Sequence, residues 1–106
     1  MTASILTVDD SPSIRMALKI ALTGAGYSVA EAGDGAEGIA KAKASAFDLI
    51  ITDLNMPVMD GLTMIEEMRR MPEQMGVPIV FLTTESDEGM KARAKAAGAT
   101  GWLTKP

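Results

Sequence analysis

The feature that most restricts the fold of this chain is a regular alternation of two hydrophobic patterns. Short runs rich in apolar residues, such as residues 5–8 and 47–53, alternate with longer segments in which apolar residues recur every three or four positions. The first pattern is typical of strands buried on both faces, and the second is typical of amphipathic helices. An alternation that continues from end to end predicts a parallel sheet with helical connections.

This pattern predicts one α/β domain with five strands and four helices. Strands are expected at residues 5–8, 27–32, 47–53, 79–82 and 101–104, and helices at about 12–22, 36–44, 62–71 and 86–97. Ser11 and Pro12 suit the start of the first helix, because a Ser side chain accepts hydrogen bonds from first-turn amides and Pro is favoured in that turn. We therefore expect an open parallel sheet with helices on both faces.

Polar side chains end or directly follow four of the predicted strands. They are Asp9 and Asp10 after the first strand, Asp53 at the end of the third, Thr83 after the fourth and Lys105 after the fifth. Ligands of open α/β sheets bind outside the carboxyl ends of the strands. The sequence therefore predicts that three carboxylates, a hydroxyl and an ammonium meet at one edge of the sheet.

The chemistry expected at this edge is that of a magnesium site. The chain has no His and no Cys, which excludes zinc fingers, disulfide frameworks and nucleophiles that depend on either residue. Crowded carboxylates repel each other unless a cation is present, and oxygen ligands favour Mg²⁺. Asp10 and Asp53 are the best direct ligands, and Asp9 could act through water. If Asp53 is also a nucleophile, its attack on a phosphoryl group would form an acyl phosphate, with Thr83 and Lys105 at the phosphoryl oxygens.

Charge and hydropathy restrict the partners of the chain. Ten Lys and Arg residues are scattered among fourteen Asp and Glu residues, for a formal net charge of −4, which argues against a nucleic-acid surface. No apolar run approaches the roughly 18 residues of a membrane span, and the N-terminus lacks the pattern of a signal peptide. These features predict a soluble, cytoplasmic protein without nucleic-acid or membrane partners.

Four segments of the chain resemble the receiver domain of two-component response regulators, most closely the single-domain chemotaxis (CheY-like) type. They are residues 8–11 (VDDS), 51–61 (ITDLNMPVMDG), 81–84 (FLTT) and 103–106 (LTKP). They occur in the order of the family and span the whole chain. The resemblance implies a flavodoxin-like sheet with the strand order 2-1-3-4-5 known for that family.

The resemblance also implies a role for each site residue. Asp53 would take a phosphoryl group from the phosphohistidine of a sensor histidine kinase or a histidine phosphotransfer protein. Mg²⁺ would be held by Asp9, Asp10, Asp53 and the backbone carbonyl of Asn55, and Thr83 would bind a phosphoryl oxygen together with Lys105. Such a domain catalyses only its own phosphorylation and dephosphorylation and is not otherwise an enzyme.

Further implications concern switching and output. Trp102 stands where the family has a switch aromatic residue, usually Tyr or Phe, that turns inward when the hydroxyl residue is drawn to the phosphate. Asn55 and Glu85 would flank the path of the hydrolytic water, as in the chemotaxis type. Because the length leaves no room for an output domain, the output would be contact with a downstream target protein, for which the flagellar motor is one candidate. A phosphatase would be a further partner.

Two other functions are compatible with the same predicted sheet. A Mg²⁺-dependent aspartyl-phosphate phosphatase of the haloacid dehalogenase type needs a second Asp two residues after the nucleophile, where this chain has Asn55. A flavin-binding module needs a phosphate loop rich in Ser, Thr and Gly after the first strand, where Asp9 and Asp10 would repel phosphate.

One departure from the family pattern lies at the end of the sequence. Receivers usually have a fifth helix after the lysine-proline turn, and this sequence stops at Pro106. We therefore expect residues 1–106 to form a receiver truncated after its fifth strand, with an apolar strip of the sheet and first helix left exposed. Such a strip would favour an oligomer or a dimer that exchanges elements.

Overall fold

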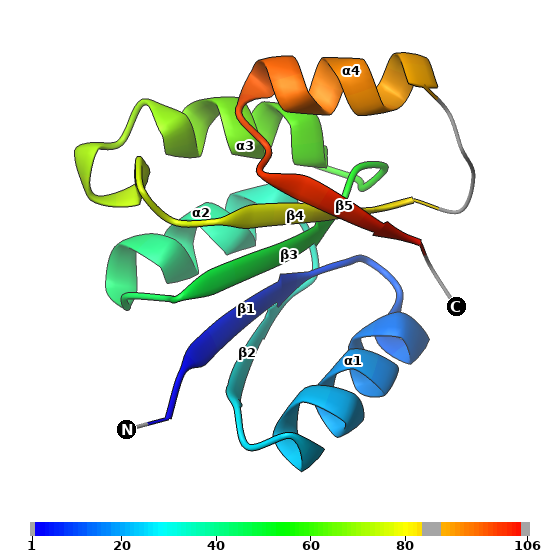
Figure 1. The fold of residues 1–106 in the computed structure, drawn as a ribbon, viewed down its shortest axis with the longest axis vertical. Helices are drawn as coiled ribbons and strands as arrows, with labels where there is room; N and C mark the ends of the chain where they lie inside the picture. The colour runs from blue at the N-terminus through cyan, green and yellow to red at the C-terminus, as the bar shows by residue number, and fades with distance from the viewer. Residues whose placement is uncertain (1, 84–87, 105–106) are drawn as a thin grey trace.

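A computed structural model of the chain describes residues 2–83 and 88–104 and is shown as a ribbon in Figure 1. Five strands form one parallel sheet in the order β2-β1-β3-β4-β5. They are β1 Ser4–Val8, β2 Ser28–Ala32, β3 Leu49–Asp53, β4 Ile79–Thr83 and β5 Gly101–Thr104. The predicted flavodoxin-like strand order is confirmed.

The strands alternate with four α-helices, as the hydrophobic pattern predicts. These are α1 Pro12–Gly24, α2 Gly35–Ala44, α3 Gly61–Arg69 and α4 Glu88–Ala97, and a short 3₁₀ helix, η1 Pro72–Gln74, follows α3. The predicted cap is confirmed, because the Ser11 hydroxyl accepts a hydrogen bond from the amide of Ile14 at 3.3 Å. Within the described residues, no helix has the length and apolar character required to cross a membrane.

Several element boundaries differ from the prediction, for reasons visible in the hydrogen bonds. The second strand begins at Ser28 rather than Tyr27, because the Tyr27 amide donates to Leu22 at the end of α1. The third strand begins at Leu49 rather than at residue 47. Asp48 precedes it and exchanges hydrogen bonds with Ser4, which turns the chain into the sheet.

The predicted third helix ends two residues early, at Arg69, and the unpredicted turn η1 follows it. Met71 is the N-cap of η1, and Pro72 suits the first turn of a new helix because it has no amide hydrogen to leave unbonded. The predicted fourth helix begins at residue 86, which lies outside the described residues; the described helix starts at Glu88.

The main core lies between the sheet and three helices. Figure 1 shows α2 and α3 over one face of the sheet, with α4 beside α3. Apolar residues of these helices and of the sheet form one buried cluster, which includes Leu6, Val8, Ile39, Ile50, Met64, Ile65, Met68, Ile79, Phe81 and Ala94. This layer holds the central strands in place, and through them the residues at their ends.

The opposite face of the sheet is covered more thinly, by α1 alone among the described helices. Its small cluster consists of Ile5, Ile51 and Leu82, with half-buried leucines and an isoleucine packed on it. No residue of α1 is fully buried, and the side chains of Met16 and Ile20 are 57% and 65% exposed. On this face, apolar side chains of α1 are therefore open to solvent, while the central sheet residues beneath the helix are buried.

Candidate functional site

The register of the sheet brings Asp9 and Asp53 to the same edge. Val8, the last residue of β1, pairs with Thr52 of β3. Asp9 and Asp53 each follow a member of this pair, so they leave the two neighbouring strands side by side. The carboxyl edge of the sheet thus joins two residues that are 44 positions apart in the sequence.

Three carboxylates converge at this edge, as predicted. Oxygen atoms of Asp9, Asp10 and Asp53 all lie within 4.8 Å of one another. Asp9 and Asp53 are buried, while Asp10 is exposed. The arrangement therefore offers oxygen ligands with one side open to solvent, which fits the preference of Mg²⁺ for a few carboxylates together with retained waters.

Backbone hydrogen bonds fix the orientation of the two buried carboxylates. Oδ1 of Asp9 accepts from the amide of Ser11 at 2.9 Å, and the Asp9 amide donates to the carbonyl of Ala32 at 3.0 Å. Oδ1 of Asp53 accepts from the amide of Leu54 at 2.8 Å. Main-chain amides directly after the two strands therefore orient these two carboxylates.

The loop between β3 and α3 is held at both of its ends. The Gly61 amide donates to the carbonyl of Leu54 at 2.9 Å, and the Gly35 amide donates to the carbonyl of Met59 at 3.0 Å. Asn55, the predicted tuning residue and carbonyl ligand, is exposed in this loop two residues after Asp53. Its predicted roles as tuning residue and carbonyl ligand stay predictions.

Thr83 ends β4 beside the acidic cluster. Asp53 pairs with Leu82 in the sheet, so Thr83 is one residue further along the neighbouring strand. Its side chain is half-buried. The other two predicted residues of this part of the site, Glu85 and Lys105, lie outside the described residues.

Trp102, the predicted switch residue, lies on β5, whose last three residues are all exposed. Its side chain is 49% exposed, and its ring centroid is 6.3 Å from that of Phe81. The ammonium of Lys91 lies 4.4 Å from the ring centroid, in range of a cation–π contact. Lys91 in turn approaches Glu88 at 3.7 Å. The indole is thus held in an outward position between β4, β5 and α4.

The structure adds a residue that the sequence reasoning did not single out. Nη1 of Arg15, in the first turns of α1, donates to the backbone carbonyl of Asp9 at 2.6 Å. Its Nε lies 3.4 Å from a carboxylate oxygen of Glu31. The sequence offers one signal for Arg15: it is a cation in the first turns of a helix, shortly after the carboxylates that end a strand.

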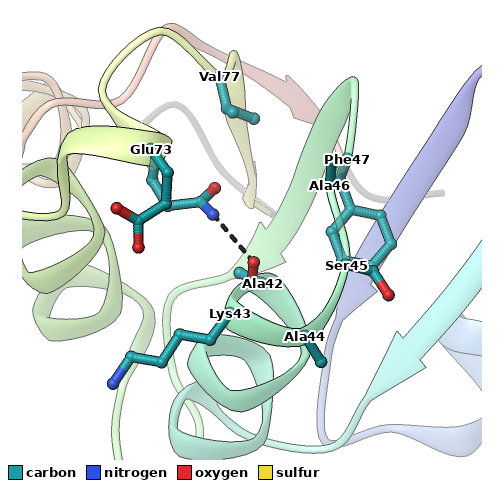
Figure 2. Close-up of a pocket in the computed structure, with 9 residues that line it drawn as sticks. Ala42, Lys43, Ala44, Ser45, Ala46, Phe47, Glu73 and Val77 are labelled. Carbon is teal, nitrogen blue, oxygen red and sulfur yellow. Dashed lines mark hydrogen bonds between the residues drawn. The ribbon is translucent and has the colours of Figure 1, made fainter.

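A pocket at the opposite edge of the sheet is separate from this site. Figure 2 shows it between the end of α2, the segment before β3 and η1. Its volume is about 270 Å³. The buried Gln74 borders it and donates from Nε2 to the carbonyl of Ala42 at 3.0 Å. Because the pocket lies at the amino ends of the strands, it has no part in the chemistry of the acidic cluster.

Comparison with known sequences identifies the family of the chain and relatives that match nearly all of it. The profile of the response regulator receiver domain matches residues 5–106. The transcriptional regulatory protein GlrR of Escherichia coli (strain K12) is 38% identical over 104 residues, which cover 98% of this chain and 23% of that protein. Protein PilH of Pseudomonas aeruginosa is 34% identical over 104 residues, which cover 98% of this chain and 86% of that protein. The chain therefore spans under a quarter of GlrR but most of PilH.

Solved structures agree with this match. The chemotaxis response regulator CheY4 of Vibrio cholerae superposes with a TM-score of 0.96 at 47% identity, over 100% of this chain and 88% of that chain. The receiver domain of the sensor histidine kinase PA1611 of Pseudomonas aeruginosa PAO1 has a TM-score of 0.92 at 30% identity, covers 100% and 87% of the two chains, and holds a magnesium ion in its active-site cleft. The receiver domain of Saccharomyces cerevisiae Ssk1 was solved with the histidine phosphotransfer protein Ypd1; its TM-score is 0.91 at 28% identity, over 99% and 79% of the chains.

Proposed function

Because the chain belongs to the family of response regulator receiver domains, we propose that Asp53 accepts the phosphoryl group of a partner's phosphohistidine. A receiver domain is a phosphoacceptor signalling module and not an enzyme that turns over a separate substrate. The observation that carries the assignment to Asp53 is the cluster of three carboxylates, with Asp53 at the end of the central strand.

The proposed reaction is an in-line phosphoryl transfer. A carboxylate oxygen of Asp53 attacks the phosphorus, an O–P bond forms as the P–N bond of phosphohistidine breaks, and the leaving imidazole nitrogen takes up a proton. Asp53 is suited to this role because its bond to the Leu54 amide fixes its carboxylate at the edge of the sheet. In our proposal the hydroxyl of Thr83 donates to a phosphoryl oxygen, and the ammonium of Lys105 pairs with another.

The donor set fits a bound Mg²⁺ ion. Asp9, Asp10, Asp53 and the backbone carbonyl of Asn55 would hold it, and the three carboxylates already approach one another within 4.8 Å. When bound, the ion neutralises negative charge on the carboxylates and on the incoming phosphoryl oxygens. The magnesium ion in the receiver domain of PA1611 supports this choice of metal.

The proposed phosphodonor is a sensor histidine kinase or a histidine phosphotransfer protein. Residues 1–106 contain no His, so the phosphohistidine lies outside this sequence. The complex of the Ssk1 receiver with Ypd1 supports a phosphotransfer protein as one such donor.

For the pathway, we propose chemotaxis or motility signalling, with output through a downstream target protein. The support is the 47% identity to CheY4, a chemotaxis response regulator, over the whole of this chain. A component of the flagellar motor is the target class that this pathway suggests, and a phosphatase would end the signal together with hydrolysis tuned by Asn55 and Glu85.

The first test measures phosphoryl incorporation by intact-mass spectrometry. The chain is incubated with acetyl phosphate with and without Mg²⁺, together with two variants, Asp53→Asn and Asp48→Asn. Asp48 is a matched control, because it is an exposed Asp at the opposite end of the same strand segment. We expect one phosphoryl group only with Mg²⁺, in the parent chain and in Asp48→Asn, and none in Asp53→Asn. Incorporation into Asp53→Asn at the parent rate would refute the assignment.

A second test addresses the proposed switch residues. Trp102 is the only tryptophan of the chain, so tryptophan emission, excited selectively over that of Tyr27, reports the surroundings of Trp102. Phosphorylation should change the emission of the parent chain, and Thr83→Ala should still be phosphorylated while its emission changes much less. An unchanged response in Thr83→Ala would show that Thr83 does not link the phosphoryl group to Trp102.

A further inference from the structure

Asp9 and Asp10 form the corner between β1 and α1. Arg15 holds this corner in place without contacting the carboxylates of the site. The guanidinium of Arg15 donates through Nη1 to the backbone carbonyl of Asp9 at 2.6 Å, and its Nε lies 3.4 Å from Oε1 of Glu31. The Arg15 side chain is only 22% exposed. One planar group therefore connects α1, the end of β1 and the end of β2.

The far end of this bridge is itself fixed. The second carboxylate oxygen of Glu31 lies 3.6 Å from Nζ of Lys19, and the backbone carbonyl of Glu31 accepts from Nζ of Lys41. In the sheet, Thr7 pairs with Glu31 and Val8 pairs with Ala32. Glu31 is therefore held in place by the sheet, and Arg15 connects it to the Asp9 carbonyl.

The carbonyl that Arg15 holds belongs to the peptide between the two acidic residues of this corner. A peptide unit is rigid and rotates as a whole. Any rotation of this unit therefore changes the direction in which the Asp10 side chain leaves the main chain. Asp9 is fixed from its other side by the hydrogen bond from its amide to Ala32. The hydrogen bond from Arg15 to the Asp9 carbonyl restrains the path to Asp10, together with the bond from the Ser11 amide to Oδ1 of Asp9.

We propose that Arg15 is a positioning residue for the magnesium site, which it organises by orienting the Asp9–Asp10 peptide and hence the carboxylate of Asp10. This inference rests on the proposed function of the acidic cluster. Arg15 contributes no ligand and contacts no reacting atom; it supports a ligand through the backbone. Groups that orient metal ligands typically change metal affinity by 10- to 100-fold when they are removed.

The test compares three variants by titration calorimetry with Mg²⁺ alone. Arg15→Met removes both contacts. Arg15→Lys keeps the charge but lacks the fork that bonds a carbonyl and a carboxylate together. Lys19→Met is the matched control, because it removes a cation of the same helix and an exposed ion pair to the same Glu31 without a contact to Asp9. Glu31 keeps its place in the sheet and its contacts with Arg15 and Lys41 in this variant. Urea unfolding without Mg²⁺ establishes that each variant is folded at the temperature of the titration.

We expect Arg15→Met to bind Mg²⁺ about tenfold more weakly than the parent chain. Arg15→Lys should also bind it more weakly, and Lys19→Met should bind it normally. The rate of phosphorylation by acetyl phosphate should show the same separation: in Arg15→Met the Mg²⁺ concentration for half-maximal rate rises, while the rate at saturating Mg²⁺ stays close to that of the parent.

Other results would overturn the inference. Parent-like Mg²⁺ affinity in Arg15→Met, or full affinity in Arg15→Lys, would remove the role of the bridging guanidinium. A loss of rate that saturating Mg²⁺ does not restore would assign Arg15 to the fold in general. Failure of the proposed function is distinguishable, because the parent chain itself would then neither bind Mg²⁺ nor accept a phosphoryl group at Asp53.

Discussion

Gly61 stands at the start of α3, where a larger residue has no room. A Cβ atom added there would lie 2.1 Å from the carbonyl oxygen of Asp53 and 2.9 Å from the Cα of Leu54. The approach is close because the Gly61 amide bonds to the Leu54 carbonyl, which draws the helix against the end of β3. The requirement for glycine therefore comes from the backbone that carries the phosphoacceptor.

Gly61→Ala should destabilise the protein and reduce phosphorylation of Asp53. Backbone atoms cannot move aside as the end of a flexible side chain can, so we expect a loss of about 2 kcal/mol in the free energy of unfolding. Urea unfolding and acetyl phosphate incorporation would measure the two effects. Gly76→Ala is the control, since nothing lies within 4 Å of its added Cβ, and its free energy should change by less than about 0.5 kcal/mol. Similar effects of the two substitutions would contradict the argument.

Val58 carries backbone strain in the same loop. It is a β-branched residue with φ of +67°, at the centre of a tight turn in which the Met59 amide donates to the Pro57 carbonyl at 2.7 Å. Its side chain is 85% exposed, so burial offers little compensation for a conformation that costs about 1–3 kcal/mol.

Val58→Asn should therefore stabilise the protein, by about 1 kcal/mol, because Asn adopts a positive φ more readily than a β-branched residue does. Thermal or urea unfolding would measure the gain. Met75→Asn serves as the comparison: Met75 is also exposed, at 65%, but has φ of −63°, so relief of strain cannot act there. An equal gain at both positions would point to a general benefit of replacing exposed apolar groups.

Among the elements, the C-terminus of α3 is tied to its neighbours through Arg69. Its Nε donates to the carbonyl of Gly98 at 2.9 Å, after α4, and its Nη1 donates to the carbonyls of Gln74 at 2.7 Å and Met75 at 3.2 Å, at the end of η1. Burial lowers the pKa of the Arg69 guanidinium, which reflects the cost of removing its charge from water. The hydrogen bonds from Arg69 to the three carbonyls offset this cost of desolvation.

Arg69→Met should destabilise the protein by about 2 kcal/mol, because it removes two part-buried, charge-assisted hydrogen bonds to the carbonyls of Gly98 and Gln74. Arg70→Met is a close control: Arg70 is the adjacent residue, it is exposed, and among the described residues its side chain makes no hydrogen bond or ion pair. Its substitution should change the free energy of unfolding by less than about 0.5 kcal/mol. Urea midpoints of the two variants that coincide would contradict this role of Arg69.

The order of the elements could be predicted from the sequence, while the arginine contacts that connect them could not. The order of the elements and the edge that collects Asp9, Asp10 and Asp53 follow from hydrophobic periodicity and from the rule that parallel strands end at one edge. The contacts of Arg69 and Arg15 could not be predicted in this way. Both bind backbone carbonyls, and every residue has one, so the sequence does not mark which carbonyl will lack a partner within its own element.

At the scale of the whole molecule, the two faces of the sheet differ in how completely they are covered. On one face, three helices bury a large cluster in which Ile65 is fully buried. On the other, α1 packs on a smaller cluster through half-buried residues such as Leu18. The free energy of folding should therefore come mainly from the first layer, since it depends on apolar area removed from water.

This asymmetry predicts different costs for similar truncations in the two layers. Ile65→Ala should cost about 3–4 kcal/mol, within the range of fully buried aliphatic residues, because it removes apolar burial and leaves a cavity. Leu18→Ala should cost about 1 kcal/mol, because its surroundings are partly open to water. Urea unfolding with linear extrapolation measures both values. If Leu18→Ala costs as much as Ile65→Ala, the α1 face must be covered in solution, and a free energy of unfolding that rises with protein concentration would then identify a second copy of the chain as the cover.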